Sequence, residues 1–153
     1  MKTRSKSAFA LVAATAAAAM TAVTFASCAD NTIYDDDYKI MNSESITKSV
    51  YSETRHNSSI KIKAKSVTGV DTLFTVEIDG GLTVSYNAEL NSGRLKIVVC
   101  DYDKVTTVFE CTEDSPAASA TDEKIELESG MYRIRLVGDS ANFELKSFSY
   151  TAY

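Results

Sequence analysis

The sequence predicts an all-β protein, a two-sheet β-sandwich that follows an export signal and a short polar tether. From Ile46 onward, apolar and polar residues alternate with a period of two, which is the repeat of a half-buried β-strand. Glycine, asparagine, aspartate and serine interrupt this alternation at short intervals, as they do in turns between strands. Because each expected strand has one apolar face, two sheets packed face to face would bury all of these faces.

The first 27 residues have the composition of an export signal. Three basic residues stand within the first six positions, and an uncharged, alanine-rich apolar stretch follows. The stretch ends in Phe25-Ala26-Ser27-Cys28, which resembles the lipobox of bacterial lipoproteins, with Phe25 where that motif usually has leucine. The resemblance implies that Cys28 becomes the first residue of the mature chain and carries lipid on its sulfur, which would anchor the protein in a membrane.

Two alternatives to lipidation remain. One is ordinary secretion, with cleavage after Ala26 and a free Cys28 thiol. The other is an uncleaved anchor helix, which an alanine-rich stretch forms poorly because its hydropathy is weak. All three interpretations place the remaining chain outside the cytoplasm, and lipidation predicts a bacterial cell membrane or cell surface location.

Residues 28–45 are expected to form a flexible tether. The segment is polar and contains three consecutive acids, Asp35, Asp36 and Asp37, with few apolar residues that could order it. Consecutive acids do not point at one centre, so this run does not indicate a metal site.

The β domain is expected to cover residues 46–153, and no amphipathic helix is expected anywhere after the signal. In chain order, strands are predicted over residues 60–64, 74–78, 82–88, 95–99, 105–111, 124–128, 132–136 and 143–150. Turn residues separate them near 68–69, 79–81, 91–93, 102–104, 129–130 and 138–139, and residues 114–122 form the one longer loop. In the last strand the apolar positions change parity, which predicts a bulge near Lys146-Ser147.

The C-terminal third carries a second resemblance. Residues 129–138, which read Ser-Gly-Met-Tyr-Arg-Ile-Arg-Leu-Val-Gly, and the following 141–145 look like the closing hairpin of secreted jelly-roll modules. Residues 92–99 are similar to an earlier strand of such modules. The resemblance implies a jelly-roll-like sandwich and transfers no ligand residue, and the chain differs from typical carbohydrate-binding members in having no tryptophan.

No disulfide is expected between Cys100 and Cys111. A hairpin that turns at residues 102–104 would pair Leu95 with Cys111, which places Cys111 on the apolar face. Cys100 would then pair with Thr106, on the opposite face and far along the strand, beyond the Cα separation of about 7 Å that a disulfide spans.

Composition and motifs argue against nucleic-acid binding and catalysis. The net charge of −5 disfavours a polyanionic partner. His56 is the single histidine and lies in a polar turn, so a histidine-dependent nucleophile is not expected. No metal or cofactor is predicted, because the chain has too few histidine and cysteine ligands for a zinc site.

Carboxylates are interpreted as surface and turn residues. Glu77, Asp79, Glu126 and Glu128 stand on outward positions or in turns, where they would aid solubility. Asp101 and Asp103 flank a hairpin tip, where a structural calcium ion is the alternative and ordinary turn chemistry is preferred.

Tyrosines give the main indication of binding. Tyr102 is at a turn and Tyr150 and Tyr153 are near the C-terminus, so these three are candidate contacts for a glycan or protein ligand. Tyr86 and Tyr132 stand at apolar positions of their strands, so they are expected to be part of the core.

Taken together, these features predict a non-catalytic, membrane-anchored binding or interaction module outside the cytoplasm. The alternatives are a structural or accessory subunit of an envelope complex and, less favoured, a hydrolase.

Overall fold

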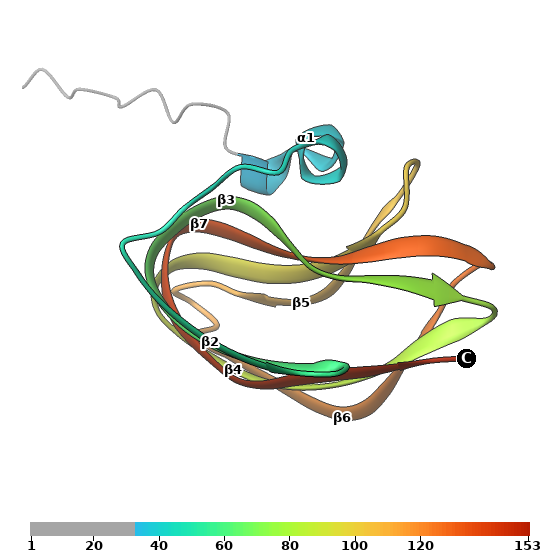
Figure 1. Ribbon diagram of the computed structural model, residues 1–153. Helices are drawn as coiled ribbons and strands as arrows, with labels where there is room; N and C mark the ends of the chain where they lie inside the picture. The colour runs from blue at the N-terminus through green and yellow to red at the C-terminus, as the bar shows by residue number, and fades with distance from the viewer. Residues whose placement is uncertain (1–32) are drawn as a thin grey trace, which may run out of the picture.

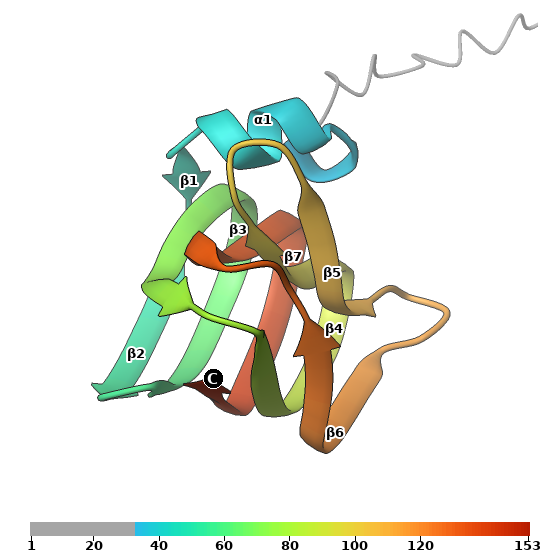
Figure 2. The same ribbon diagram turned by 90° about the vertical axis from the view of Figure 1, so that its right-hand side faces the viewer.

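The computed structural model describes residues 33–153, which form a two-layered β-sandwich (Figures 1 and 2). The prediction of an all-β, jelly-roll-like two-sheet sandwich is confirmed. The signal expected over residues 1–27 and the lipidation site at Cys28 lie outside the described residues. In chain order the elements are η1 (Ile33–Asp35), α1 (Asp37–Asn42), β1 (Ile46–Thr47), β2 (Val50–His56), β3 (Ser59–Ile78), β4 (Gly81–Cys100), β5 (Val105–Cys111), β6 (Ala117–Glu126) and β7 (Gly130–Ala152).

Three long strands build both layers of the sandwich. β3, β4 and β7 contain 20, 20 and 23 residues, and each bends so that its two halves lie in different layers (Figure 1). All pairs are antiparallel. The first layer has the order β2-β3-β7-β4-β6, and the second layer has the order β1-β3-β7-β4-β5.

The three bends replace turns that the sequence predicted. Residues 68–69, 91–93 and 138–139 do not end strands but lie inside β3, β4 and β7, next to one another, where the strand register shifts. Gly93 has a φ of +80°, and a Cβ atom there would lie 2.5 Å from the carbonyl oxygen of Asp139. Glycine chemistry at these points therefore permits a sharp bend between strands that approach closely.

Other turns and the bulge agree with the sequence. Tight turns join β3 to β4, β4 to β5 and β6 to β7. The bulge predicted at Lys146-Ser147 is confirmed, because Ile60 pairs with Phe148 whereas Ile62 pairs with Leu145. The loop expected over residues 114–122 is shorter than predicted, since β6 already begins at Ala117.

The β4–β5 hairpin has the predicted register in its inner half. Leu95 pairs with Cys111, as expected, but a shift after Ile97 pairs Cys100 with Val105 instead of Thr106. Both cysteines are free and buried, and they lie at opposite ends of the hairpin. Burial raises the pKa of both thiols, which keeps them protonated.

The main core fills the space between the layers. Its side chains come from alternate positions of β3, β4, β5 and β7, as the period of two requires. The largest buried members are Phe143, Phe148, Ile60, Ile62, Leu73, Ile78, Leu82, Leu95 and Ile97.

Residues 33–44 form a strap over the outer face of the second layer. This part of the expected tether is therefore ordered, and it contains the helix α1, whereas no helix was expected after the signal. Residues 28–32 of the expected tether lie outside the described residues. Tyr34 and Ile40 are buried in a second cluster with Val70, Val98 and Val137 (Figure 2 shows α1 above the sandwich). The Tyr34 hydroxyl donates to Glu110 at 2.8 Å. These two apolar side chains order a segment that is otherwise polar.

Arg135 connects the strap to β7. Its side chain is fully buried, and its guanidinium donates to the carbonyls of Ile40, Met41 and Ser43 at the end of α1. It also pairs with Glu44 at 2.5 Å. A buried arginine thus satisfies the last carbonyls of a helix of six residues.

Candidate functional site

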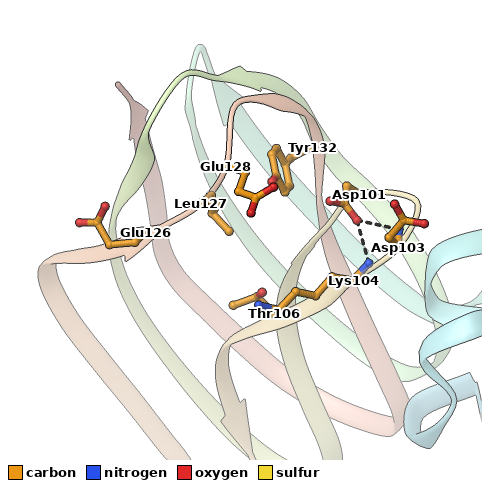
Figure 3. A pocket seen from close by; sticks show the side chains of 8 residues that line it. All are labelled: Asp101, Asp103, Lys104, Thr106, Glu126, Leu127, Glu128 and Tyr132. Carbon is orange, nitrogen blue, oxygen red and sulfur yellow. Dashed lines mark hydrogen bonds between the residues drawn. The ribbon is translucent and has the colours of Figure 1, made fainter.

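A cleft opens at the end of the sandwich opposite the bends. The turns that follow β3, β4 and β6 gather there together with the C-terminus (Figure 1). The cleft has a volume of about 550 Å³. Its lining, shown in Figure 3, consists of Asp101, Asp103, Lys104, Thr106, Glu126, Leu127, Glu128 and Tyr132.

The β4–β5 hairpin forms one wall of the cleft. Asp101 Oδ1 accepts hydrogen bonds from the backbone amides of Asp103 and Lys104, both at 2.7 Å (Figure 3). These amides hold the pKa of the Asp101 carboxyl below its usual range. Turn chemistry therefore explains Asp101, as the sequence favoured, and its charge fixes the tip that carries Asp103 and Lys104.

The loop between β6 and β7 forms the facing wall. The Ser129 hydroxyl donates to the carbonyl oxygen of Asp79 at 2.6 Å, and the Leu127 amide donates to Gly80 at 3.4 Å. These bonds fasten the loop to the β3–β4 turn. They position Glu126 and Glu128 along the cleft, with Leu127 between them (Figure 3).

Tyr132 connects the core to the cleft. Its side chain is only 7% exposed and belongs to the main core, as its parity predicted. It nevertheless contributes to the lining, beside Glu128 in Figure 3. Burial raises the pKa of its hydroxyl, so the phenol stays neutral and able to hydrogen-bond.

The cleft is acidic. Of the eight described residues that line it, four carry carboxylates and one, Lys104, carries a positive charge. Carboxylates accept hydrogen bonds from hydroxyl and amino groups, and together they repel anions. Leu127 and Tyr132 supply apolar surface, so the lining suits a ligand that combines hydroxyl or amino donors with an apolar face.

The three candidate tyrosines occupy different surroundings. Tyr102 is 80% exposed at the hairpin tip. Tyr153 is 46% exposed, and its hydroxyl donates to Glu126 of the cleft at 3.5 Å. Tyr150 is half-buried and packs edge-on against Phe74, with ring centroids 4.9 Å apart. Tyr102 and Tyr153 therefore flank the cleft, whereas Tyr150 packs against the core.

Sequence reasoning did not identify Glu126 and Glu128 as site residues. It interpreted them as part of a solubilising surface, because nothing in their spacing placed them opposite the hairpin tip. Cys100 of β4 pairs with Arg133 of β7, and this pairing brings Asp101 beside Tyr132. It also brings the loop that precedes β7 beside the tip of the β4–β5 hairpin. The only sequence feature that could have indicated the site is a pair of carboxylates at each wall, Asp101 with Asp103 and Glu126 with Glu128.

His56 lies far from the cleft. It is the last residue of β2 and is exposed, as expected. Four strand-to-strand steps separate β2 from β6 in the first layer, which is about 19 Å at about 4.8 Å for each step. His56 is therefore at the opposite edge of the first layer from Glu126, and it is not among the residues that line the cleft.

Residues 33–153 contain no group of three histidine, cysteine, aspartate or glutamate side chains that is arranged to hold a metal ion. No helix in this part of the chain is long and apolar enough to cross a membrane.

Comparisons with known proteins leave the family open. No family model and no curated protein matches the chain. Among solved structures, it is similar to the C-terminal family 6 carbohydrate-binding module of LamC, a laminarinase from Zobellia galactanivorans (TM-score 0.40, 10% identity, 69% of this chain and 90% of that one). It is also similar to a family 29 carbohydrate-binding module (TM-score 0.38, 13% identity, 72% and 80% coverage). Superpositions this loose assign neither a family nor a ligand.

Proposed function

We propose that this protein is a non-catalytic binding module whose ligand is an uncharged glycan held in the cleft. The observation that carries the proposal is the lining itself, in which Asp103, Glu126 and Glu128 share one cleft with the neutral phenol of Tyr132. Acceptor groups next to an apolar wall match the hydroxyl groups and apolar faces of a sugar. The excess of carboxylates disfavours sulfated, phosphorylated or uronic acid-containing chains.

Catalysis is not part of the proposal. The one imidazole belongs to His56, which ends β2, and β2 lies about 19 Å from β6 when the distance is counted in strand steps. The Asp101 carboxyl has a lowered pKa and accepts two backbone amides, so it is unsuited to act as a general acid. Glycoside hydrolysis by the remaining carboxylates is therefore the outcome that would contradict the proposal.

A glycan array followed by calorimetry tests this function. The wild-type protein should bind a neutral glycan, and Glu128→Ala should weaken binding about tenfold, the equivalent of about 1.4 kcal/mol. Glu77→Ala is the matched control, because Glu77 is an exposed glutamate outside the cleft lining. Binding that Glu128→Ala leaves unchanged, or release of reducing sugar from the bound glycan, would overturn the proposal.

We further propose that Cys28 is lipidated and that the module is anchored at a bacterial cell membrane or cell surface, with its domain outside the cytoplasm. Support comes from the basic start, the apolar stretch and the Phe25-Ala26-Ser27-Cys28 motif. Positions 29–32 separate Cys28 from the first residue of the strap, so the lipid would hold the domain within about 18 Å of the bilayer by the reach of an extended chain.

A further inference from the structure

Two exposed apolar side chains, Tyr102 at the tip of the β4–β5 hairpin and Met131 near the start of β7, line one hollow, and we call this pair the platform. Tyr102 is 80% exposed and Met131 is 54% exposed, and they are two of the five exposed large apolar residues in the described chain. They share a shallow hollow of about 190 Å³ with Thr75, Asp101, Tyr132 and Arg133. Paired apolar side chains that remain exposed in this way mark a candidate contact surface.

The Tyr102 ring is held in place from one side. The Arg133 guanidinium lies 5.5 Å from the centre of the ring, within the range of a cation–π interaction. Arg133 is itself fixed, because it donates to the carbonyl oxygen of Met41 at 2.6 Å and lies 3.8 Å from Glu44. Arg133 therefore occupies one face of the ring, and the high exposure of Tyr102 leaves the other face to a ligand.

The platform adjoins the cleft. Asp101 and Tyr132 line both hollows, so the two share a ridge at the end of the second layer. The cleft lies on the side of this ridge that faces the β6–β7 loop, and the platform lies on its outer side. A ligand that fills the cleft and continues over the ridge would next meet Met131 and the open face of Tyr102.

We infer that the ligand is a linear, uncharged oligosaccharide that binds along its length, with one part in the cleft and the next part on the platform. This inference rests on the proposed function and adds the length and direction of the ligand. The cleft supplies hydrogen-bond acceptors, and the platform supplies an aromatic face on which a sugar ring packs. Since Arg133 holds the aromatic ring beforehand, little conformational entropy is lost when the second contact forms.

Calorimetry with a length series of the glycan found on the array tests the inference. The wild-type protein should bind the hexasaccharide at least about tenfold more tightly than the monosaccharide, the equivalent of about 1.4 kcal/mol. Tyr102→Ala should abolish this gain, so that the hexasaccharide binds no more tightly than the monosaccharide does. Tyr102→Phe, the matched control, should keep the gain because the aromatic face remains. Because Tyr102 is exposed, the variants should fold, which near-UV circular dichroism verifies.

The outcomes separate this inference from the proposed function. If no glycan binds the wild-type protein, both fail. If a glycan binds with the same affinity at every length, the cleft alone holds it and only the inference fails. An equal loss of monosaccharide and hexasaccharide affinity in Tyr102→Ala would also overturn it, because Tyr102 would then belong to the cleft.

Discussion

At the scale of single residues, Asp101 determines the shape of one wall of the cleft. The lowered pKa of its carboxyl means that folding favours the charged form. The stabilisation is therefore fully present at pH values above 3.8, the ordinary pKa of this carboxyl group. It is lost as the pH falls through the lower pKa that the group has in the folded protein. Because solvent screens this partly exposed charge, we expect Asp101→Asn to reduce the free energy of unfolding by only about 1 kcal/mol at pH 7, and by progressively less below pH 3.8.

Urea titrations at several pH values measure this effect. Asp103→Asn is the control, since Asp103 lies in the same tip and contributes its backbone amide to the bonds described above. A deficit in Asp101→Asn that stays constant from pH 7 to about pH 2, below the ordinary range of an aspartate pKa, would show that the charge of Asp101 is not the cause.

Arg135 is the residue on which the strap depends. Replacement by methionine keeps a side chain of similar length but removes the hydrogen bonds that Arg135 donates to the carbonyls of Ile40, Met41 and Ser43. Because buried carbonyls then lose their partners, we expect Arg135→Met to cost about 2–3 kcal/mol. Hydrogen exchange should become faster in residues 33–44, with the strands of the main core still protected.

Arg133→Met is the matched control for Arg135. Arg133 is half-buried and donates to a single carbonyl of the strap, that of Met41, so its loss should have a smaller effect. Unchanged exchange in the strap of Arg135→Met would mean that Tyr34 and Ile40 hold the strap without the arginine.

At the scale of elements, the alternation of apolar residues predicted which faces of the strands are buried. The alternation could not predict how many strands there are, because the same glycine and small polar residues occur at turns between strands and at bends within a strand. Residues 91–93 and 79–81 both carry glycine next to a small or polar residue, yet only the second range ends a strand. Long-range pairing with β7 distinguishes them, and a single sequence does not contain that pairing.

The strap was missed for a related reason. A helix of six residues is too short to show a helical period, and its neighbours are polar and acidic. The strap is ordered because Tyr34 and Ile40 pack against Val70, Val98 and Val137. These three valines form an apolar patch on the outer face only after the strands have paired. The cleft was missed likewise, because its two walls come from turns that meet only in the folded chain.

The bend in β4 makes a direct test of this architecture. Gly93 has a positive φ, and a Cβ atom added to it would lie 2.5 Å from the carbonyl oxygens of Asp139 and Ser140. We expect Gly93→Ala to cost about 3 kcal/mol, from backbone strain and the required separation of β4 and β7. Thermal unfolding measures the effect.

Gly130→Ala is the control for the bend. A Cβ atom at Gly130 would have its nearest neighbour at 3.6 Å, on the ring of Tyr132, and φ is not positive there. Its melting temperature should stay close to that of the wild type. Equal stability of the Gly93 and Gly130 variants would show that the bend does not depend on glycine.

At the scale of the whole molecule, the two ends of the sandwich differ in what they offer. The bends and the start of the strap lie together, because Arg94 of β4 pairs with Asp35 of η1 and with Asp139 of β7, both at 2.8 Å. The cleft and the platform are lined by residues of the turns at the opposite end. A chain anchored through residues just before the strap would therefore keep its ligand site free.

Anchoring through Cys28 is the last prediction, and cell fractionation tests it. Loss of the signal removes three of the 16 basic residues, so 13 basic and 21 acidic residues give the mature chain a net charge of −8. Anionic lipid repels such a chain, so under the lipidation proposal its membrane attachment comes from acyl chains, at about 0.8 kcal/mol for each buried CH₂ group. Cys28→Ala should move the protein from the membrane fraction to the soluble fraction. Ser27→Ala should stay with the membrane, since it keeps the thiol and a small residue before it. A Cys28→Ala variant that remains in the membrane fraction would instead support an uncleaved anchor helix.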